Sequence, residues 1–401
     1  MTDGTGRLTS VGWLRSMVPR ATDEDHRAST PLELLFDLCF VVAVSQAAAG
    51  LERGMTAGRI GSSLVGYLTV FFAIWWAWVN FTWFASAYDI DDVAYRLLTF
   101  VQIAGALVLA AGVSSAFSGG DFATITAGYV VMRVAMVAQW LRAAASDPEG
   151  RSAALHYALG ITLLQIGWVL RLLVPHSWGD ITFLLLGTGE ILVPWWAERG
   201  GRSTTWHPGH INERYGLFTL IVLGESVAAA TIAIQSAVSS SSISASLVGL
   251  AVGGLALVFG LWWWYFEHPA EEGLRVSRRL AFAWGYGHYF IFASVAAFGA
   301  GLEVAVHTVE HHGTSSRTVA ALAVAVPVAV FVVVTAALHT ALRRDWPLRR
   351  WYPPLAVVGL VGLALLAHWV SPAVVIPLMA LVMAGLVVAD SLASRSVVPI
   401  G

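Results

Sequence analysis

Apolar residues in this chain form long continuous runs that are separated by short polar segments. A helix needs about 20 mostly apolar residues to cross a bilayer. Strands of a membrane β-barrel would instead alternate polar and apolar positions. We therefore predict an all-α polytopic membrane helix bundle with about twelve transmembrane helices, near residues 32–50, 62–86, 94–117, 122–144, 154–174, 178–197, 211–236, 244–266, 278–302, 318–342, 354–370 and 372–392.

Composition and charge agree with this pattern. Of the 401 residues, 57% are hydrophobic and 12% are charged, which is too apolar for a soluble domain. Every basic residue is arginine, and roughly 17 arginines fall on the side of the N-terminus against roughly four on the other side. The positive-inside rule therefore predicts a multi-pass protein of the cell (inner or plasma) membrane with both termini cytoplasmic.

Two polar tails are expected at the ends, residues 1–30 in the cytoplasm and residues 396–401. The first tail contains no apolar core, so we expect no cleaved signal peptide and let the first span act as the targeting signal. Apolar residues from Leu8 to Val18 recur at helical spacing between arginines. This spacing is typical of a helix that lies on the membrane surface, although a disordered polar tail fits equally well.

A weak internal repeat has an offset of 180 residues. "ELLFDLCFVVAVS" from Glu33 aligns with "ERYGLFTLIVLGE" from Glu213, and a tryptophan-rich span that ends in acidic residues follows each. The repeat predicts two six-helix units, residues 31–200 and 201–395. Because six is an even number, the two units should share one orientation as parallel repeats.

The first motif places two carboxylates in a membrane span. Glu33 and Asp37 are four residues apart and so lie on one helical face. Glu33 either caps the start of the helix, where acids meet the positive end of the dipole, or belongs to a site. Asp37 lies one turn deeper, where an unpaired charge costs about 3 kcal/mol or more, so it needs a partner or a proton.

The second motif, "HINERYGLFTLIVLGES", begins with polar residues and ends with an acid. It sets His210, Arg214 and Glu225 along one stripe, with Glu213 beside them. Glu225 should lie roughly 20 Å into the span at 1.5 Å per residue. Two interpretations stay open for Glu225: a structural ion pair with another helix, or a functional site.

Further polar side chains fall at membrane depth, namely Asn80, Gln102, Arg133, Gln139, Gln165, Glu190 and His288. Arg133 should neutralise one of Asp37, Glu190 and Glu225. Acids then still outnumber cations. Such a surplus predicts either protonated carboxyl groups or a hydrated cavity that admits a cation.

Tryptophans gather in two spans, as Trp75, Trp76, Trp78 and Trp83 in the first and as Trp262, Trp263 and Trp264 in the second. Most tryptophans of membrane proteins anchor the chain at the interface. The alternative is an aromatic-lined cavity that faces the acids and holds a cation through ring faces. Trp76, Trp83 and Trp263 are the candidates for that role.

Few signs point to a metal, a cofactor or a nucleic acid. Cys39 is the single cysteine, which excludes an intrachain disulfide and a thiolate zinc site. The stretch "HTVEHHG" is more typical of exposed histidines than of a metal site. We expect no cofactor, no metal and no nucleic-acid partner. The expected partners are the lipid bilayer and a small-molecule or ion substrate, and a homo-oligomer is compatible with the sequence.

The two motifs resemble those of the bacterial low temperature requirement A (LtrA) membrane protein family. "PLELLFDLCFVVAVSQ" is similar to the family pattern at Glu33, Phe36, Asp37, Leu38, Phe40 and Val41. The second motif is similar at Glu213, Arg214, Leu217, Leu223, Gly224 and Glu225. The resemblance covers nearly all of residues 30–395 and implies a multi-pass membrane protein, but it implies no particular activity.

Three functions compete. The first is a transporter or channel that moves a cation, a proton or a proton-coupled small molecule past intramembrane carboxylates. The second is an intramembrane enzyme in which Asp37 or Glu225 protonates a lipid or isoprenoid and tryptophan faces stabilise the carbocation. The third is a non-catalytic membrane stress factor. The candidate binding residues are Glu33, Asp37, Trp76, Asn80, Trp83, Arg133, Glu190, His210, Glu213, Arg214, Glu225, Trp263 and His288.

Overall fold

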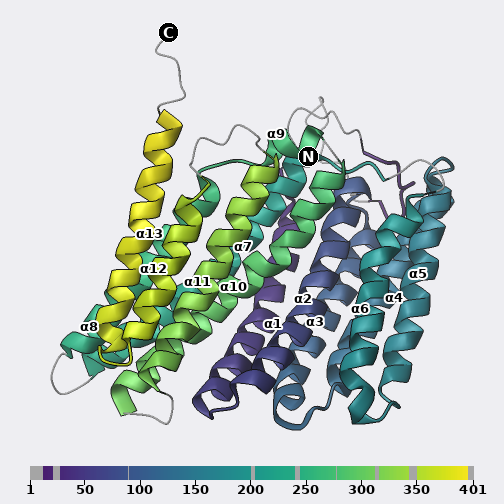
Figure 1. The fold of residues 1–401 in the computed structure, drawn as a ribbon. Helices are drawn as coiled ribbons and strands as arrows, with labels where there is room; N and C mark the ends of the chain where they lie inside the picture. Colours follow the sequence, from purple (N-terminus) through teal and green to yellow (C-terminus); the bar gives the residue numbers. More distant parts are fainter. Residues whose placement is uncertain are drawn as a thin grey trace. The chain divides into compact units, whose positions relative to one another are not determined.

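The computed structural model describes residues 12–20, 28–88, 90–199, 204–239, 244–276, 278–311, 316–342 and 350–395. All regular secondary structure within these ranges is helical (Figure 1). The helices are α1 (Pro31–Thr56), α2 (Ile60–Tyr88), α3 (Val93–Gly119), α4 (Ala123–Ser146), α5 (Arg151–Arg171), the 3₁₀ helix η1 (His176–Trp178), α6 (Gly179–Ala197), α7 (Pro208–Ser239), α8 (Ala245–Phe266), α9 (Glu271–Val276), α10 (Arg278–His311), α11 (Arg317–Leu342), α12 (Tyr352–Leu366) and α13 (Pro372–Arg395).

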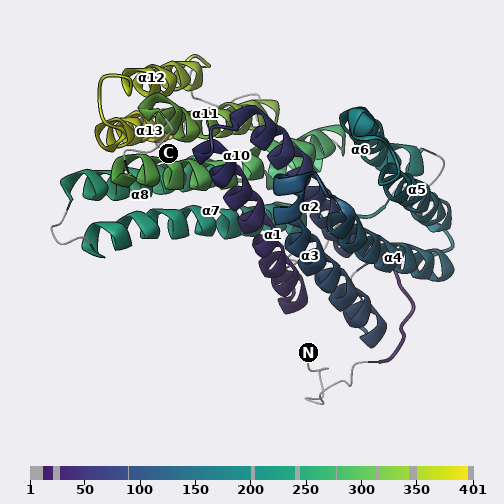
Figure 2. The same cartoon turned by 90° about the horizontal axis from the view of Figure 1, so that it is seen from below.

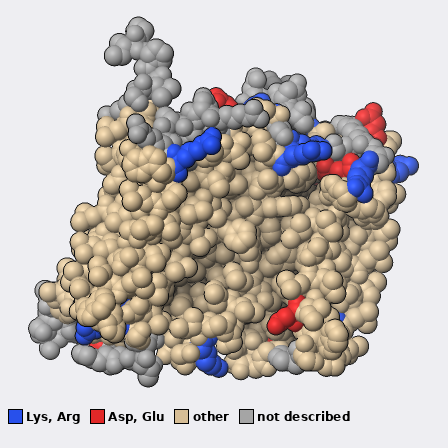
Figure 3. Space-filling model, in the orientation of Figure 1, with Lys and Arg blue, Asp and Glu red and all other residues tan. Residues whose placement is uncertain are grey.

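Each predicted apolar run coincides with one of the long helices, which confirms the all-helical class. Ten helices in the described residues are long and apolar enough to cross a membrane. The other two long helices are α6 and the 15-residue α12, which spans only about 22 Å at 1.5 Å per residue. On the face shown in Figure 3, charged side chains lie mainly towards the two ends of the helices. The protein is a multi-pass membrane protein, while twelve crossings and cytoplasmic termini stay predictions.

Two compact units can be distinguished. The first comprises Met1–Ala43 and Ala73–Ile211, and the second comprises Val44–Phe72 and Asn212–Gly401. The start of α1 and the end of α2 therefore belong to the first unit, whereas the other halves of both helices belong to the second. The parallel six-helix repeats and their boundary at residue 200 stay predictions.

Helices of the first unit pack in sequential pairs, α3 on α4, α4 on α5 and α5 on α6 (Figure 2). Glycines set the distance between α3 and α4. A Cβ atom added to Gly128 would lie 2.4 Å from the backbone nitrogen of Leu109 and 2.5 Å from the backbone oxygen of Gly105. Only glycine permits this approach of two helix backbones.

The second unit contains a pairing that does not follow the chain order. The last helix, α13, packs against α8, while α10 packs on α11 and α11 packs on α12. A Cβ atom on Gly253 of α8 would lie 2.7 Å from the backbone nitrogen of Pro377 in α13. The pair α8–α13 is thus held by the same kind of close contact.

The N-terminal tail differs from both sequence interpretations where it is described. Residues 12–20 form no helix, and they bind the start of α3 instead of lying free. The backbone N–H of Val93 donates to the carbonyl of Gly12 at 3.1 Å, and the backbone N–H of Arg15 donates to Asp92 at 2.7 Å. The first N–H groups of a helix have no partner within the helix, and here part of that need is met by the tail. Residues 1–11 lie outside the described residues.

Replacing Gly128 by alanine should destabilise the α3–α4 pair. The added methyl group meets backbone atoms that cannot move aside, and overpacking typically costs about 1–3 kcal/mol. The apparent melting temperature of detergent-purified protein should therefore fall. Gly385→Ala on α13 is the control, because no heavy atom lies within 4 Å of its added Cβ and its stability should stay level or rise. Equal melting temperatures for Gly128→Ala and the wild type would contradict this account.

Candidate functional site

Glu33 caps the start of α1. The backbone N–H and the hydroxyl of Thr30 donate to its Oε2 atom at 2.8 and 3.0 Å, and the backbone N–H of Glu33 donates to Thr30 Oγ1 at 3.3 Å. This reciprocal arrangement is a capping box. The capping interpretation of Glu33 is therefore confirmed.

The second oxygen of Glu33 meets a histidine of the other motif. Glu33 Oε1 lies 3.1 Å from Nε2 of His210, and both side chains are fully buried. His210 sits in the first turn of α7, where its backbone N–H donates to the ring nitrogen Nδ1 of His207 at 3.1 Å. His207 thus caps α7 just ahead of Pro208, a residue suited to the first helical position. Each motif begins a helix, and the two helix starts meet in the first unit.

Asp37 is fully buried one turn deeper in α1. The indole N–H of Trp78, on α2, donates to its Oδ1 atom at 2.7 Å. Trp75 lies one turn before Trp78 in α2. Next to Asp37 in α1, the ring of Phe36 stacks on the ring of Phe81, with 3.9 Å between the two ring centroids. The tryptophan therefore meets the acid with its N–H edge and not with its ring face.

Glu190 on α6 is the centre of a buried polar cluster that joins four helices. It accepts hydrogen bonds from Trp76 of α2 at 2.9 Å, from Tyr129 of α4 at 3.0 Å and from Trp168 of α5 at 3.2 Å. Nη2 of Arg133 on α4 lies 3.1 Å from Glu190 Oε2 and also donates to the Tyr129 hydroxyl. The prediction that Arg133 neutralises one of the three deep acids is confirmed, and the acid is Glu190.

The groups around Glu190 are hydrogen-bond donors. Indole and guanidinium groups can donate but cannot accept, so Trp76, Trp168 and Arg133 all direct N–H groups at the oxygens of Glu190. The acid is paired with Arg133. It is not one of the surplus acids that the sequence led us to expect, and its geometry is that of a scaffold.

A group of acids in the second unit fits that expectation better. Glu303 on α10 interacts electrostatically with Glu225 on α7 and with Glu52 on α1, and Arg53 acts on it with the opposite sign. Glu225 and Glu303 are half-buried, and Glu52 is buried. Glu303 therefore interacts with acids from two other helices, and we call these three carboxylates the acidic cluster.

Close packing of α7 on α10 brings this acidic cluster together. The hydroxyl of Ser226 donates to the carbonyl of Val295 at 3.0 Å, and a Cβ on Gly299 would lie 3.4 Å from the Cα of Ser226. Residues 295, 299 and 303 are spaced by four and share one face of α10. Glu303 therefore lies on the face that packs against α7, next to the turn that carries Glu225.

Sequence reasoning missed Glu52 and Glu303 for one reason. The predicted spans ended at residues 50 and 302, but α1 continues to Thr56 and α10 continues to His311. Both acids were therefore assigned to loops. The available signal was the apolar sequence that resumes after Glu303, in "GLEVAVHTV".

Several other candidates have contacts of a structural kind. The side-chain amide of Asn80 donates to the carbonyl of Trp76 in its own helix at 2.8 Å. Trp83 packs edge-on against Trp206, with 5.1 Å between the ring centroids. His288 is fully buried, with Nδ1 2.7 Å from the Trp284 carbonyl and Nε2 2.9 Å from the Tyr265 hydroxyl. Since a carbonyl only accepts, Nδ1 of His288 carries the hydrogen.

Two motif residues lie at the start of α7 in the second unit. Arg214 is fully buried, and the neighbouring Glu213 is half-buried. Arg214 is thus a second buried arginine, in addition to Arg133.

The tryptophan clusters differ from each other. Trp75, Trp76 and Trp78 are buried, so the interface-anchor interpretation is wrong for them. In the second cluster Trp264 is buried, whereas Trp262 is 46% and Trp263 is 50% exposed.

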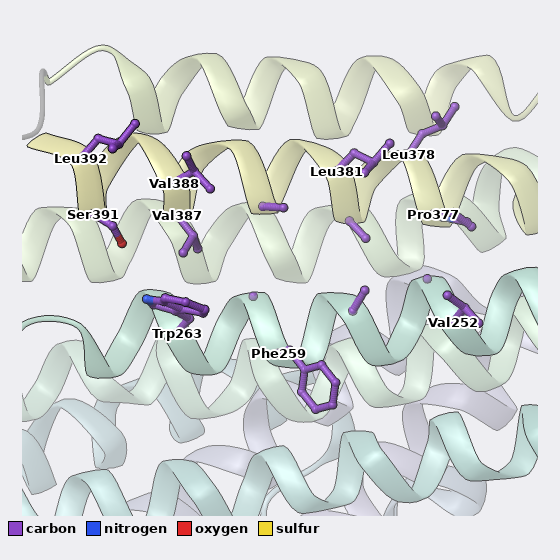
Figure 4. A pocket seen from close by; sticks show the side chains of 15 residues that line it. Val252, Phe259, Trp263, Pro377, Leu378, Leu381, Val387, Val388, Ser391 and Leu392 are labelled. Atoms are coloured by element: carbon purple, nitrogen blue, oxygen red, sulfur yellow. The ribbon is translucent and has the colours of Figure 1, made fainter.

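The exposed Trp263 lies beside a groove in the second unit. Its indole N–H donates to Glu267 Oε2 at 2.6 Å. Trp263 and Phe259 of α8 line a groove of about 670 Å³ together with residues of α13 such as Leu381 and Val388 (Figure 4). The lining of the groove is apolar apart from Trp263 and Ser391. Such a surface is suited to lipid chains.

Breaking the ion pair of Glu190 should be strongly destabilising. In Arg133→Met a buried carboxylate loses its counter-ion, which typically costs about 3–5 kcal/mol, whereas replacing both partners by apolar residues is often close to neutral. We expect a large fall in the melting temperature for Arg133→Met and recovery of most of it in Arg133→Met/Glu190→Leu. A double variant no more stable than the single one would rule out this balance of charge.

Comparisons with known proteins identify relatives of the chain but no activity. The model of the family "Bacterial low temperature requirement A protein (LtrA)" matches residues 28–389. An uncharacterized protein of Rhizobium meliloti (strain 1021) is 27% identical over 309 residues, which are 73% of this chain and 72% of that protein. No solved structure matches. Both motif helices and the buried cluster around Glu190 lie within the matched residues, and the chain belongs to the LtrA family of membrane proteins.

Proposed function

We propose that this protein transports a cation or a proton through the membrane, and that the acidic cluster of Glu52, Glu225 and Glu303 binds it. The observation that supports this function is the electrostatic interaction of Glu303 on α10 with Glu52 on α1 and with Glu225 on α7. Glu225 was a candidate binding residue from the sequence, and its interaction with Glu303 strengthens the case for a binding site there.

The charge balance at the acidic cluster favours a positively charged cargo. Arg53 and His307 are the positive groups that act on Glu52, and Arg53 also acts on Glu303; both are exposed. Like charges that share one site disfavour ionisation, and a charge in an apolar span is costly. A bound proton or cation relieves both effects, so the acidic cluster is suited to bind and release one.

The acids of the first unit have a different role in this proposal. Glu33 caps α1 and contacts His210, Asp37 accepts from Trp78, and Glu190 is neutralised by Arg133. Their contacts fix the positions of helix starts and helix faces. In this role these acids position the helices. The protein then lies in the cell membrane with both termini in the cytoplasm.

The two alternative functions have less support. Acid-initiated chemistry on an isoprenoid needs a carboxyl group that donates a proton and aromatic faces that stabilise a carbocation. Trp76 and Trp78 direct indole N–H groups at carboxylates instead. No contact described above favours the enzyme or the non-catalytic stress factor over transport.

Ion flux through purified protein in liposomes tests the proposal. Wild-type protein should carry protons or monovalent cations above the rate of empty liposomes, measured with an entrapped pH-sensitive dye under an imposed K⁺ or Na⁺ gradient. Glu303→Gln and Glu225→Gln should each reduce the flux at least tenfold, because they remove a charge from the acidic cluster.

The control for this experiment is Glu271→Gln. Glu271 lies on α9, has a side chain that is 41% exposed, and pairs with Arg275 at 2.7 Å, so the same chemical change there should leave the flux intact. Wild-type flux no higher than in empty liposomes, or equal flux in all variants, would refute the proposed function.

A further inference from the structure

A groove between α4 and α5 of the first unit combines a membrane-facing opening with buried polar atoms. Its volume is about 330 Å³, and its described lining residues belong to these two helices. At its rim Val134, Ile166 and Leu170 are 62%, 53% and 55% exposed. Apolar side chains so exposed on membrane-spanning helices face lipid, so the groove opens towards the bilayer.

Two polar side chains line the groove with unused hydrogen-bonding atoms. Arg133 is 2% exposed and uses Nη2 for Glu190 and Tyr129, while its Nε and Nη1 have no partner. Gln165 is 8% exposed, and neither its amide oxygen nor its amide nitrogen has a partner. Burying such groups without partners is unfavourable, so this part of the groove is built for a guest that forms hydrogen bonds.

The charge of the surroundings determines which guest fits. Glu190 already balances Arg133, so an anionic guest would add an uncompensated charge in an apolar region. The three N–H groups on Nε and Nη1 of Arg133 can only donate, and the amide of Gln165 can donate as well. A neutral molecule with an acceptor oxygen satisfies these donors and leaves the charge balance intact.

The depth of the groove narrows the choice further. Arg133 lies ten residues after Ala123, the first residue of α4, or about 15 Å along the helix at 1.5 Å per residue. This is near the middle of a helix that spans the bilayer. Phospholipid esters belong to the interfacial region outside the hydrocarbon core. A carbonyl compound that dissolves among the acyl chains can reach this depth.

We propose that the groove between α4 and α5 binds a neutral, membrane-dissolved carbonyl compound of the quinone class. A ring oxygen accepts hydrogen bonds from Arg133 and Gln165, and the apolar remainder lies against Val137, Ile161 and Val169. The volume is at the lower end for small-molecule sites, which suits a ring headgroup whose tail extends into lipid. The proposal concerns binding only and is independent of the proposed transport.

Binding of decylubiquinone to the full-length protein in phosphatidylcholine nanodiscs tests this proposal. Wild-type protein should bind it saturably, as measured by quenching of tryptophan fluorescence, since Trp168 lies one turn from Gln165. Gln165→Leu removes the amide but keeps the volume, and it should weaken binding about three- to tenfold, the worth of one hydrogen bond. Val169→Trp fills the groove and should abolish saturable binding.

Leu381→Trp is the matched control. Leu381 lies in the apolar groove between α8 and α13, so the same bulk is added to a groove without buried polar side chains, and binding should be unchanged. Circular dichroism and size-exclusion chromatography should show that all variants are folded. Non-saturable quenching, or equal affinity in the wild type, Gln165→Leu and Val169→Trp, would overturn the proposal.

Native mass spectrometry distinguishes a quinone from a lipid. Retention of decylubiquinone by the wild type and its loss in Val169→Trp would support the quinone class. The opposite result is that the wild type retains phosphatidylcholine even when decylubiquinone is added, and that Val169→Trp does not retain it. That result would show that an ester carbonyl occupies the groove, and it would overturn the quinone assignment.

Discussion

The ion pair between Arg133 and Glu190 is the interaction on which the first unit depends. A charge within hydrocarbon is tolerated only when it is paired and hydrogen-bonded, and here the partners come from α2, α4, α5 and α6. The requirement to satisfy one carboxylate thus fixes the positions of four helices relative to one another. Glycine contacts such as that of Gly128 with α3 then set how closely neighbouring helices approach.

Pairing and hydrogen bonding of polar side chains are incomplete in two other places, and both are candidates for function. In the second unit Glu303 interacts with two further acids, and the positive groups that act on Glu52 and Glu303 are an exposed arginine and an exposed histidine. In the groove between α4 and α5, nitrogen atoms of Arg133 and the amide of Gln165 have no partner. Glu190 is satisfied by four donors, whereas these groups are satisfied less completely.

The two sequence motifs act mainly as helix starts. Glu33 closes a capping box with Thr30, and His207 caps α7. The contact of Glu33 with His210 then joins the two starts. The motif residues that attract attention in the sequence therefore position the helices, whereas Glu52 and Glu303, which no motif contains, complete the acidic cluster.

The sequence by itself determined the helical class, the approximate extent of each long helix and the need of Arg133 for an acidic partner. These follow from the length of apolar runs and from the free energy of a charge in lipid, which are local properties. Only the tertiary structure decided which acid pairs with Arg133, which tryptophans point inwards and which acids meet at Glu303. These depend on how helices distant in sequence rotate and pack against one another, and side-chain periodicity alone does not specify that rotation.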